Sequence, residues 1–203
     1  MKWTTRGPSF FGSIAEALPR FRTEGCRALA EGYAALMAEG GGAIPEKNGL
    51  DISRFVPAIP HLVLTAIRKP DQCIYRLAGD DMISRIGMNP KGKNYYDFVP
   101  KDRFAHASQA MHMVIDIPSS FRADIAQQYS DGRVRMVEAL AVPLGSDDPD
   151  VDGFILFADC EASREPSMLP TDRMLLGANV LARDLIDLGH GVDRSFVDRV
   201  IAT

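Results

Sequence analysis

One carboxylate, that of Glu138, lies in an otherwise largely apolar run, RVRMVEALAVPL at 133–144. Strand alternation predicts that Glu138 shares one face with the row Val134, Met136, Leu140 and Val142. A carboxylate held among apolar groups often belongs to a functional site, and with Tyr95 or Tyr96 as a hydrogen-bond donor it could serve as the base of a small isomerase. The structural alternative is that Glu138 pairs with Arg76 or reaches solvent at a sheet edge. Both readings stay open at this level.

Two histidines on one predicted helix raise the question of haem. At about 100° per residue, the helix predicted over 101–116 places His112 at the edge of the face that carries Phe104, and His106 nearly opposite. Only His112 is therefore predicted to face a pocket. A single histidine at a helix edge is more often an ordinary hydrogen-bonded residue than an axial ligand, so the sequence disfavours haem.

The acidic segment 148–159 copies part of a calcium-loop spacing, with Asp148, Asp150, Asp152, Gly153 and Asp159 at the matching positions. Calcium loops of this kind lie between helices, whereas EALAVPLG and FILFAD on either side read as strands. A solvated hairpin loop is the preferred interpretation, with a weak cation site as the alternative. No metal site is predicted.

The three cysteines, Cys26, Cys73 and Cys160, have no CxxC spacing, which argues against a zinc site or a disulfide framework. They fit a reducing, cytoplasmic setting. Catalytic motifs such as GxSxG, HExxH and a phosphate-binding glycine loop are absent from the sequence. No enzymatic activity is therefore predicted.

Composition limits the remaining classes of function. The chain has 203 residues, a net charge of −4 and 46% hydrophobic residues, as expected of one globular domain with additions. Nucleic acids and anionic membranes are bound mainly through clustered Lys and Arg, so a net negative chain argues against both as partners. No apolar run approaches the length of a membrane span.

The elements that would position these side chains form a helix, a strand-rich middle and a second helix. Apolar spacing predicts a helix over 19–39, ended by Gly40, with an earlier capped turn at Ser13 and Glu16. Strands are predicted at 61–67 and 74–79, joined by a turn at Pro70 and Asp71. A short helix at 80–86 and the long helix at 101–116 come next, followed by strands over SFRADIAQQY, RVRMVEALAVPL and FILFA.

A terminal helix is predicted from Thr171 to Leu188, ended by Gly189. Its predicted apolar stripe consists of Met174, Leu175, Ala178, Leu181, Ala182 and Leu185. Val192, Phe196, Val197 and Val200 have helical spacing in the tail that follows. These apolar stripes suggest a homodimer formed through the terminal helices.

In this order the elements resemble a PAS domain. YRLAGDDMISRIG resembles the second PAS strand entering its first small helix, and GKNYYDFVPKDR resembles the segment that leads into the long connecting helix. GGGAIPEKNGLDISRFVPAIPHLVL and EALAVPLGSDDPDVDGFILF are similar to the compact bacterial single-domain variant. The resemblance covers 38–160, leaving 1–37 and 161–203 as helical extensions.

The resemblance implies an α+β fold: a five-stranded antiparallel sheet with short helices and one long helix on one face, and the terminal helices on the other. It also implies a small ligand between the sheet and the helices at 80–116. A flavin photoadduct is disfavoured, because GMNPKGKNYY lacks the cysteine that light-sensing flavin domains use. The predicted pocket residues are Arg76, Tyr95, Tyr96, Phe98, Phe104, Met111, His112, Phe121, Ile125, Met136 and Glu138.

The predicted function is that of a cytoplasmic, bacterial-type sensory or regulatory protein that acts without catalysis. A small, partly apolar ligand would bias the sheet, and the sheet would pass that bias to the terminal helices and to a signalling protein partner. The competing predictions are a ligand-free homodimeric interaction module and the isomerase described above.

Overall fold

The computed structural model describes residues 6–162 and 175–196. Its centre is one curled sheet of seven strands in the order β1-β7-β4-β5-β6-β2-β3. The strands are β1 (Ser9–Phe11), β2 (Leu62–Arg68), β3 (Gln72–Ala78), β4 (Ser119–Tyr129), β5 (Val134–Leu144), β6 (Gly153–Glu161) and β7 (Leu175–Asp187). All neighbouring strands are antiparallel except β1, which runs parallel to β7.

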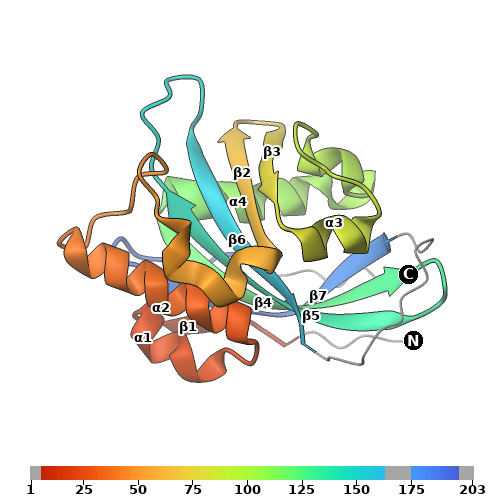
Figure 1. Cartoon of the computed structure of the whole chain (residues 1–203), viewed down its shortest axis with the longest axis horizontal. Helices are drawn as coiled ribbons and strands as arrows, with labels where there is room; N and C mark the ends of the chain where they lie inside the picture. Colours follow the sequence, from red (N-terminus) through yellow and green to blue (C-terminus); the bar gives the residue numbers. More distant parts are fainter. Residues whose placement is uncertain (1–5, 163–174, 197–203) are drawn as a thin grey trace.

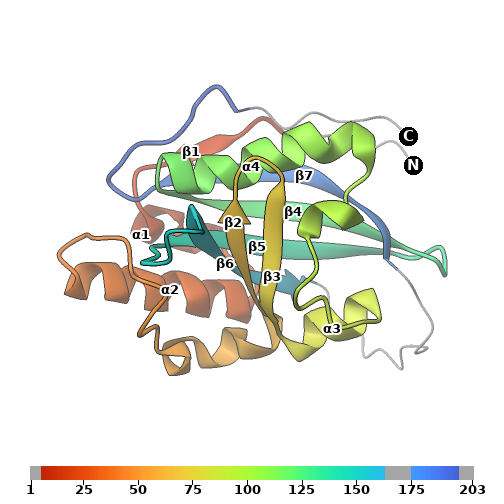
Figure 2. The ribbon, with the colours of Figure 1, turned by 90° about the horizontal axis from the view of Figure 1, so that it is seen from above.

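Helices cover both faces of the sheet, as Figures 1 and 2 show from two directions. The outer face is covered by the amino-terminal elements α1 (Ile14–Ala17), η1 (Leu18–Arg20), α2 (Glu24–Glu39) and η2 (Ile52–His61). The inner face is covered by α3 (Asp80–Ile86), η3 (Tyr95–Phe98), η4 (Lys101–Arg103) and α4 (Phe104–Asp116). Each face therefore has its own hydrophobic core.

Several predicted elements are confirmed. The hairpin of β2 and β3, the short helix α3 and the three strands β4 to β6 lie where the sequence patterns placed them. The Ser13 side chain accepts a hydrogen bond from the Glu16 backbone N–H, which confirms the predicted cap. The long helix is also present, with its first turn in the tighter form of η4.

The carboxy-terminal helix was predicted wrongly, because residues 175–187 form the strand β7. This strand pairs with β4 along its length and adds a sixth antiparallel strand to the predicted five. Thr171, Met174, Val197 and Val200 lie outside the described residues. The homodimer through terminal helices stays a prediction, but residues 175–187 form a strand and cannot supply a helix to such an interface.

The outer face has an apolar core of its own. Leu140, Val142 and Leu144 of β5 pack there against Leu29 and Tyr33 of α2. The Tyr33 hydroxyl donates a hydrogen bond of 2.8 Å to the Pro143 backbone carbonyl, which satisfies it within this core. Among the described residues, no helix is long and apolar enough to cross a membrane.

Candidate functional site: the inner face of the sheet

The inner face carries a connected series of aromatic rings. Ring centroids lie 6.3 Å apart for Tyr75 and Tyr95, 5.6 Å for Tyr95 and Tyr96, and 5.1 Å for Tyr96 and Phe104. Mostly edge-on geometries at these distances are favourable for aromatic pairs. Burial raises the pKa of Tyr95 to about 12, so its hydroxyl stays protonated at neutral pH. These rings form an apolar surface with phenol groups between η3 and the edge strand β3.

The sequence places these rings through local backbone chemistry. The Asn94 side chain accepts hydrogen bonds from the backbone N–H groups of Cys73, at 2.9 Å, and Tyr96, at 3.3 Å. It also donates to the Asp71 carbonyl at 2.8 Å. One amide group therefore starts η3 and attaches it to the β2–β3 hairpin, which fixes where Tyr95 and Tyr96 lie.

A buried polar cluster lies farther along the same face. Arg85, from α3, donates to the Asp159 carboxylate at 2.8 Å, to the Asp159 backbone carbonyl at 2.7 Å and to the Gln127 side chain at 3.2 Å. The Tyr129 hydroxyl donates to the same Gln127 oxygen at 2.8 Å. Burial lowers the pKa of Arg85, but the charge and hydrogen bond of Asp159 outweigh burial and raise it, so the guanidinium stays charged.

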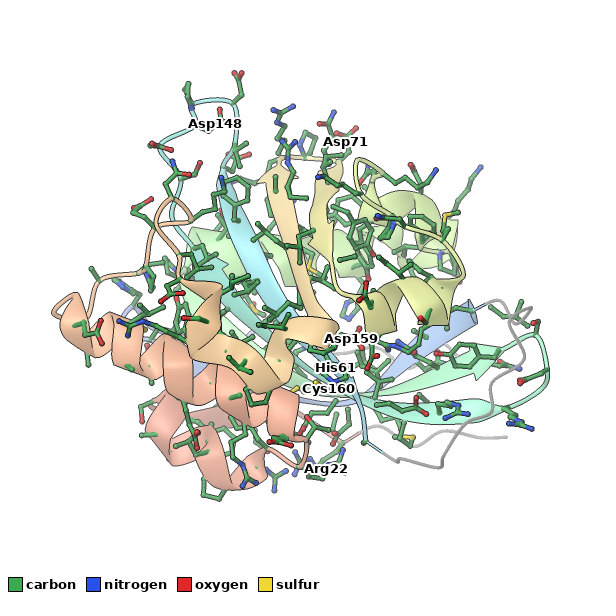
Figure 3. The ribbon with its side chains drawn as sticks, in the orientation of Figure 1. Arg22, His61, Asp71, Asp148, Asp159 and Cys160 are labelled. Carbon is green, nitrogen blue, oxygen red and sulfur yellow. The ribbon has the colours of Figure 1, made fainter. Side chains whose placement is uncertain are left out.

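Arg85 is the polar residue on this face that the sequence analysis missed. Its side chain is 6% exposed and connects α3 to β6 and β4. The sequence held one clue that Arg85 faces the sheet: it lies three residues after Met82 on a short helix and so shares a helix face with it. An arginine at such a position usually faces solvent, however. Asp159 was considered only as a position in a calcium loop. Its bonds to Arg85 place it in the sheet, and Figure 3 shows it far from Asp148 at the tip of the β5–β6 loop.

The inner core contains six of the predicted pocket residues: Tyr95, Tyr96, Phe104, Met111, Phe121 and Ile125. Phe98 is 46% exposed, and its ring meets that of Tyr75 at 6.2 Å between centroids. His112 is half-buried on α4, with Nε2 3.4 Å from the Ser108 hydroxyl. Burial lowers the pKa of His112. His106, predicted to point away, stacks on Phe196 at 4.9 Å between centroids.

Three predicted pocket residues lie elsewhere. Arg76 is exposed on the edge strand β3. Glu138 faces the outer core, and alternation places Met136 on that face with it. The pairing of Phe121 with Ala141 and of Ile125 with Val137 shows that the inward row of β5 is Arg135, Val137, Ala139 and Ala141. The prediction took the more apolar row as the pocket side, whereas that row packs under α2.

Glu138 is instead the anion at the start of α2. Its carboxylate accepts hydrogen bonds from the backbone N–H groups of Arg22 and Thr23, the Thr23 hydroxyl and Arg122 Nε, the last at 2.6 Å. Burial alone would raise the pKa of Glu138, but the hydrogen bonds from Thr23 and Arg22 and the charge of Arg122 lower it. Arg122, not Arg76, is its partner, and Glu138 lies on the opposite face of the sheet from Tyr95 and Tyr96, its suggested partners in the isomerase alternative.

Arg122 extends this cluster across the outer face. It contacts Asp184 of β7 at 3.1 Å and Asp124 of β4 at 2.7 Å. Arg6 reaches the same Asp184 carboxylate at 2.6 Å, and Arg22 pairs with Asp124. These ion pairs connect β7 and the amino-terminal segment to the centre of the sheet.

Comparisons with known proteins give remote structural likeness alone. No family model matches the chain, and no curated protein matches it. A fungal LOV domain photoreceptor is similar at 18% identity with a TM-score of 0.39, covering 63% of this chain and 89% of that one. An RNA-binding light-oxygen-voltage receptor is similar at 15% identity with a TM-score of 0.39, covering 73% of this chain and 54% of that one. LOV domains belong to the PAS fold, but similarity this remote leaves membership of that family a proposal.

Proposed function

We propose that this protein is a PAS-type sensory or regulatory domain that binds a small molecule on the inner face of its sheet. The observation that carries the proposal is the presence of two complementary surfaces on that one face. The rings of Tyr75, Tyr95, Tyr96 and Phe104 offer an apolar, flat-sided environment, and the cluster around Arg85 offers charged and amide groups. A ligand with a flat apolar body and one polar group fits this combination.

Movement of α3 is the proposed response. The helix is short. Its Arg85 bonds Asp159, and the Asp81 carboxylate lies 2.8 Å from Nδ1 of His61 on η2. A ligand whose polar group accepts hydrogen bonds from Arg85 would draw the guanidinium away from Gln127 and Asp159 and shift α3. The bias would then pass through β6, where Asp159 faces inward and its neighbours Ala158 and Cys160 face α2.

The test compares two arginine variants of the full chain in a ligand screen read by thermal unfolding. A compound present at about 100 times its dissociation constant stabilises the folded state by about 2.7 kcal/mol, which raises Tm measurably. Arg85→Met should abolish the Tm shift, whereas Arg76→Met, at an exposed position of the neighbouring strand, should keep it. If Arg85→Met does not fold, Tyr129→Phe, which removes the hydroxyl that bonds Gln127, should weaken the shift.

Native mass spectrometry of the freshly purified protein supplies the second readout. A co-purified small molecule that is lost from Arg85→Met and kept by Arg76→Met supports the proposal. A Tm shift equal in all three variants would contradict the assignment of the inner face.

An interaction module without a ligand is the second candidate, and one observation favours it. Ile52, Val56 and Ile59 on η2 are 46%, 60% and 38% exposed, beside α2 on the outer side. Exposed apolar side chains that lie together often mark protein contacts. In this reading the protein forms a homodimer or binds a signalling partner, and no compound of the screen raises its Tm. Val56→Asp should then abolish self-association in analytical ultracentrifugation.

A further inference from the structure

Two cysteine side chains meet where α2 crosses the outer face of β6. Cys26 is 0% exposed and Cys160 is 2% exposed. Cys26 Sγ lies 3.4 Å from the Glu138 carbonyl oxygen and 3.5 Å from the Ala158 carbonyl oxygen. Glu138 is the register partner of Cys160 on β5, and Ala158 precedes Cys160 by two positions on the same face. The thiol of Cys26 is therefore held directly above the segment of sheet that carries Cys160, and burial, followed by the nearby Cys160 thiol, raises the pKa of Cys26.

Gly25 makes this approach possible. A Cβ atom at this position would lie 2.6 Å from Cys160 Sγ and 3.1 Å from His61 Cδ2, which is closer than side-chain atoms normally come. Only glycine lets the first turn of α2 lie this close to β6. Figure 3 shows Cys160 and His61 side by side at this crossing, with Arg22 nearby.

We propose that Cys26 and Cys160 form a redox-sensitive pair that closes to an intramolecular disulfide and thereby links α2 covalently to β6. The oxidant is a peroxide. One thiolate attacks a peroxide oxygen and becomes a sulfenic acid as the other oxygen leaves as water after taking up a proton. The second thiolate then attacks the sulfenic sulfur and the hydroxyl leaves as water, so two thiols and one hydrogen peroxide give one disulfide and two waters.

The folded arrangement keeps this reaction slow until α2 moves. Burial raises the pKa of Cys26, and a protonated, buried thiol is a poor nucleophile. The start of α2 is held by the bonds of the Glu138 carboxylate to Arg22 and Thr23. Lifting this end exposes the pair, so the rate of oxidation follows local opening of the amino-terminal elements from the sheet. This inference is independent of any ligand on the inner face.

Cys73 provides a matched control within the same chain. It is 1% exposed, comparable to Cys160, but lies on β3 in the inner core, on the opposite face of the sheet. If oxidation requires two neighbouring thiols, Cys73 should stay reduced. If oxidation requires only transient opening of the fold, all three cysteines should be oxidised.

The experiment treats the full chain and its Cys26→Ser, Cys160→Ser and Cys73→Ser variants with hydrogen peroxide, followed by intact mass and non-reducing peptide mapping. The wild type and Cys73→Ser should lose the mass of two hydrogen atoms, give a cross-linked peptide of Cys26 and Cys160, and recover on reduction. Neither of the other variants should do so, and circular dichroism before treatment checks that they fold. Cys26→Ala replaces Cys26→Ser if the hydroxyl is not tolerated.

Glu138→Gln should speed formation of the disulfide at least about tenfold, because the start of α2 opens more readily. The proposal is overturned if the folded wild type gains oxygen on single cysteines instead of forming the cross-link, if Cys73 takes part, or if the disulfide joins two chains. An oxidation rate unchanged in Glu138→Gln would overturn the gating by α2.

Discussion

Replacing Glu138 by Gln tests the main claim about the outer face, that a buried carboxylate fixes the start of α2. The carboxylate is fully buried and accepts bonds from two backbone N–H groups, the Thr23 hydroxyl and Arg122. A glutamine keeps one acceptor oxygen and turns an NH2 group toward remaining donors. Removing one partner of a buried ion pair costs about 3–5 kcal/mol, and Arg122 keeps Asp184 and Asp124 as partners. We therefore expect a loss of about 2–4 kcal/mol.

Urea unfolding followed by circular dichroism measures this loss, and its pH dependence gives an independent check. The pKa of Glu138 is lowered in the folded state from its ordinary value of 4.5. Its stabilising contribution is therefore complete above that ordinary value and is lost as the pH falls through the lower, folded value. The wild type should lose stability over this acidic range more steeply than Glu138→Gln.

A matched control removes the same charge from an exposed site. Glu31 is exposed on α2, so Glu31→Gln should change the free energy of unfolding by less than about 0.5 kcal/mol and keep the wild-type pH dependence. If Glu138→Gln unfolds at the wild-type urea midpoint with the wild-type response to acid, the carboxylate does not hold α2 and the geometry described for it is refuted.

Three further substitutions test the packing of the two faces, each by urea unfolding. Tyr33→Phe removes the hydroxyl that bonds the Pro143 carbonyl and should cost about 1 kcal/mol; an unchanged midpoint would show that water replaces the bond. Gly25→Ala should cost about 1–3 kcal/mol by crowding Cys160, whereas Gly7→Ala, with open space around it, should cost less than about 1 kcal/mol. Phe196→Ala, at a ring 1% exposed, should cost about 3 kcal/mol, well above the cost of Phe98→Ala at 46% exposure, and equal costs would contradict the packing of Phe196 on His106.

The strand-rich middle was predictable because its signals are local. The turn at Pro70 and Asp71 and the alternation along 119–144 specify hairpins without knowledge of the rest of the chain. The hydrophobic spacing of α2 and the cap at Ser13 are likewise set by neighbours within one or two helical turns. These elements needed no long-range information.

The strand β7 was not predictable in this way. Its second half, from Ala182 to Ile186, is buried on both faces, which removes the alternation that identifies a half-exposed strand and leaves spacings that also suit a helix. Arg183 and Asp184 are both buried, one over the Phe121 ring and the other against Arg122. Those partners are more than fifty residues away in sequence, so tertiary contacts decide the local structure here.

The error at Glu138 has a related physical origin. Alternation correctly separated the two rows of β5, but which row faces a ligand depends on what covers each face. The row of Val137, Ala139 and Ala141 has small side chains and faces the helices of the inner side, whereas the row with Leu140 and Val142 packs under α2. A sheet covered on both faces has two apolar rows, so hydrophobicity alone cannot choose between them.

The two clusters of charge are linked by the strands they share. Along β4, Arg122 and Asp124 face outward while Gln127 and Tyr129 face inward; along β6, Asp159 bonds Arg85 on the inner side and Cys160 meets Cys26 on the outer side. Successive side chains of one strand point to opposite faces, so a shift of the β6 backbone at Asp159 also displaces Cys160. The Asp159 carbonyl is itself an acceptor for Arg85, so release of α3 acts on the backbone as well as on a side chain. In the proposed response, coupling between the inner face and α2 therefore needs movement of one strand only, without a continuous chain of moving side chains through the core.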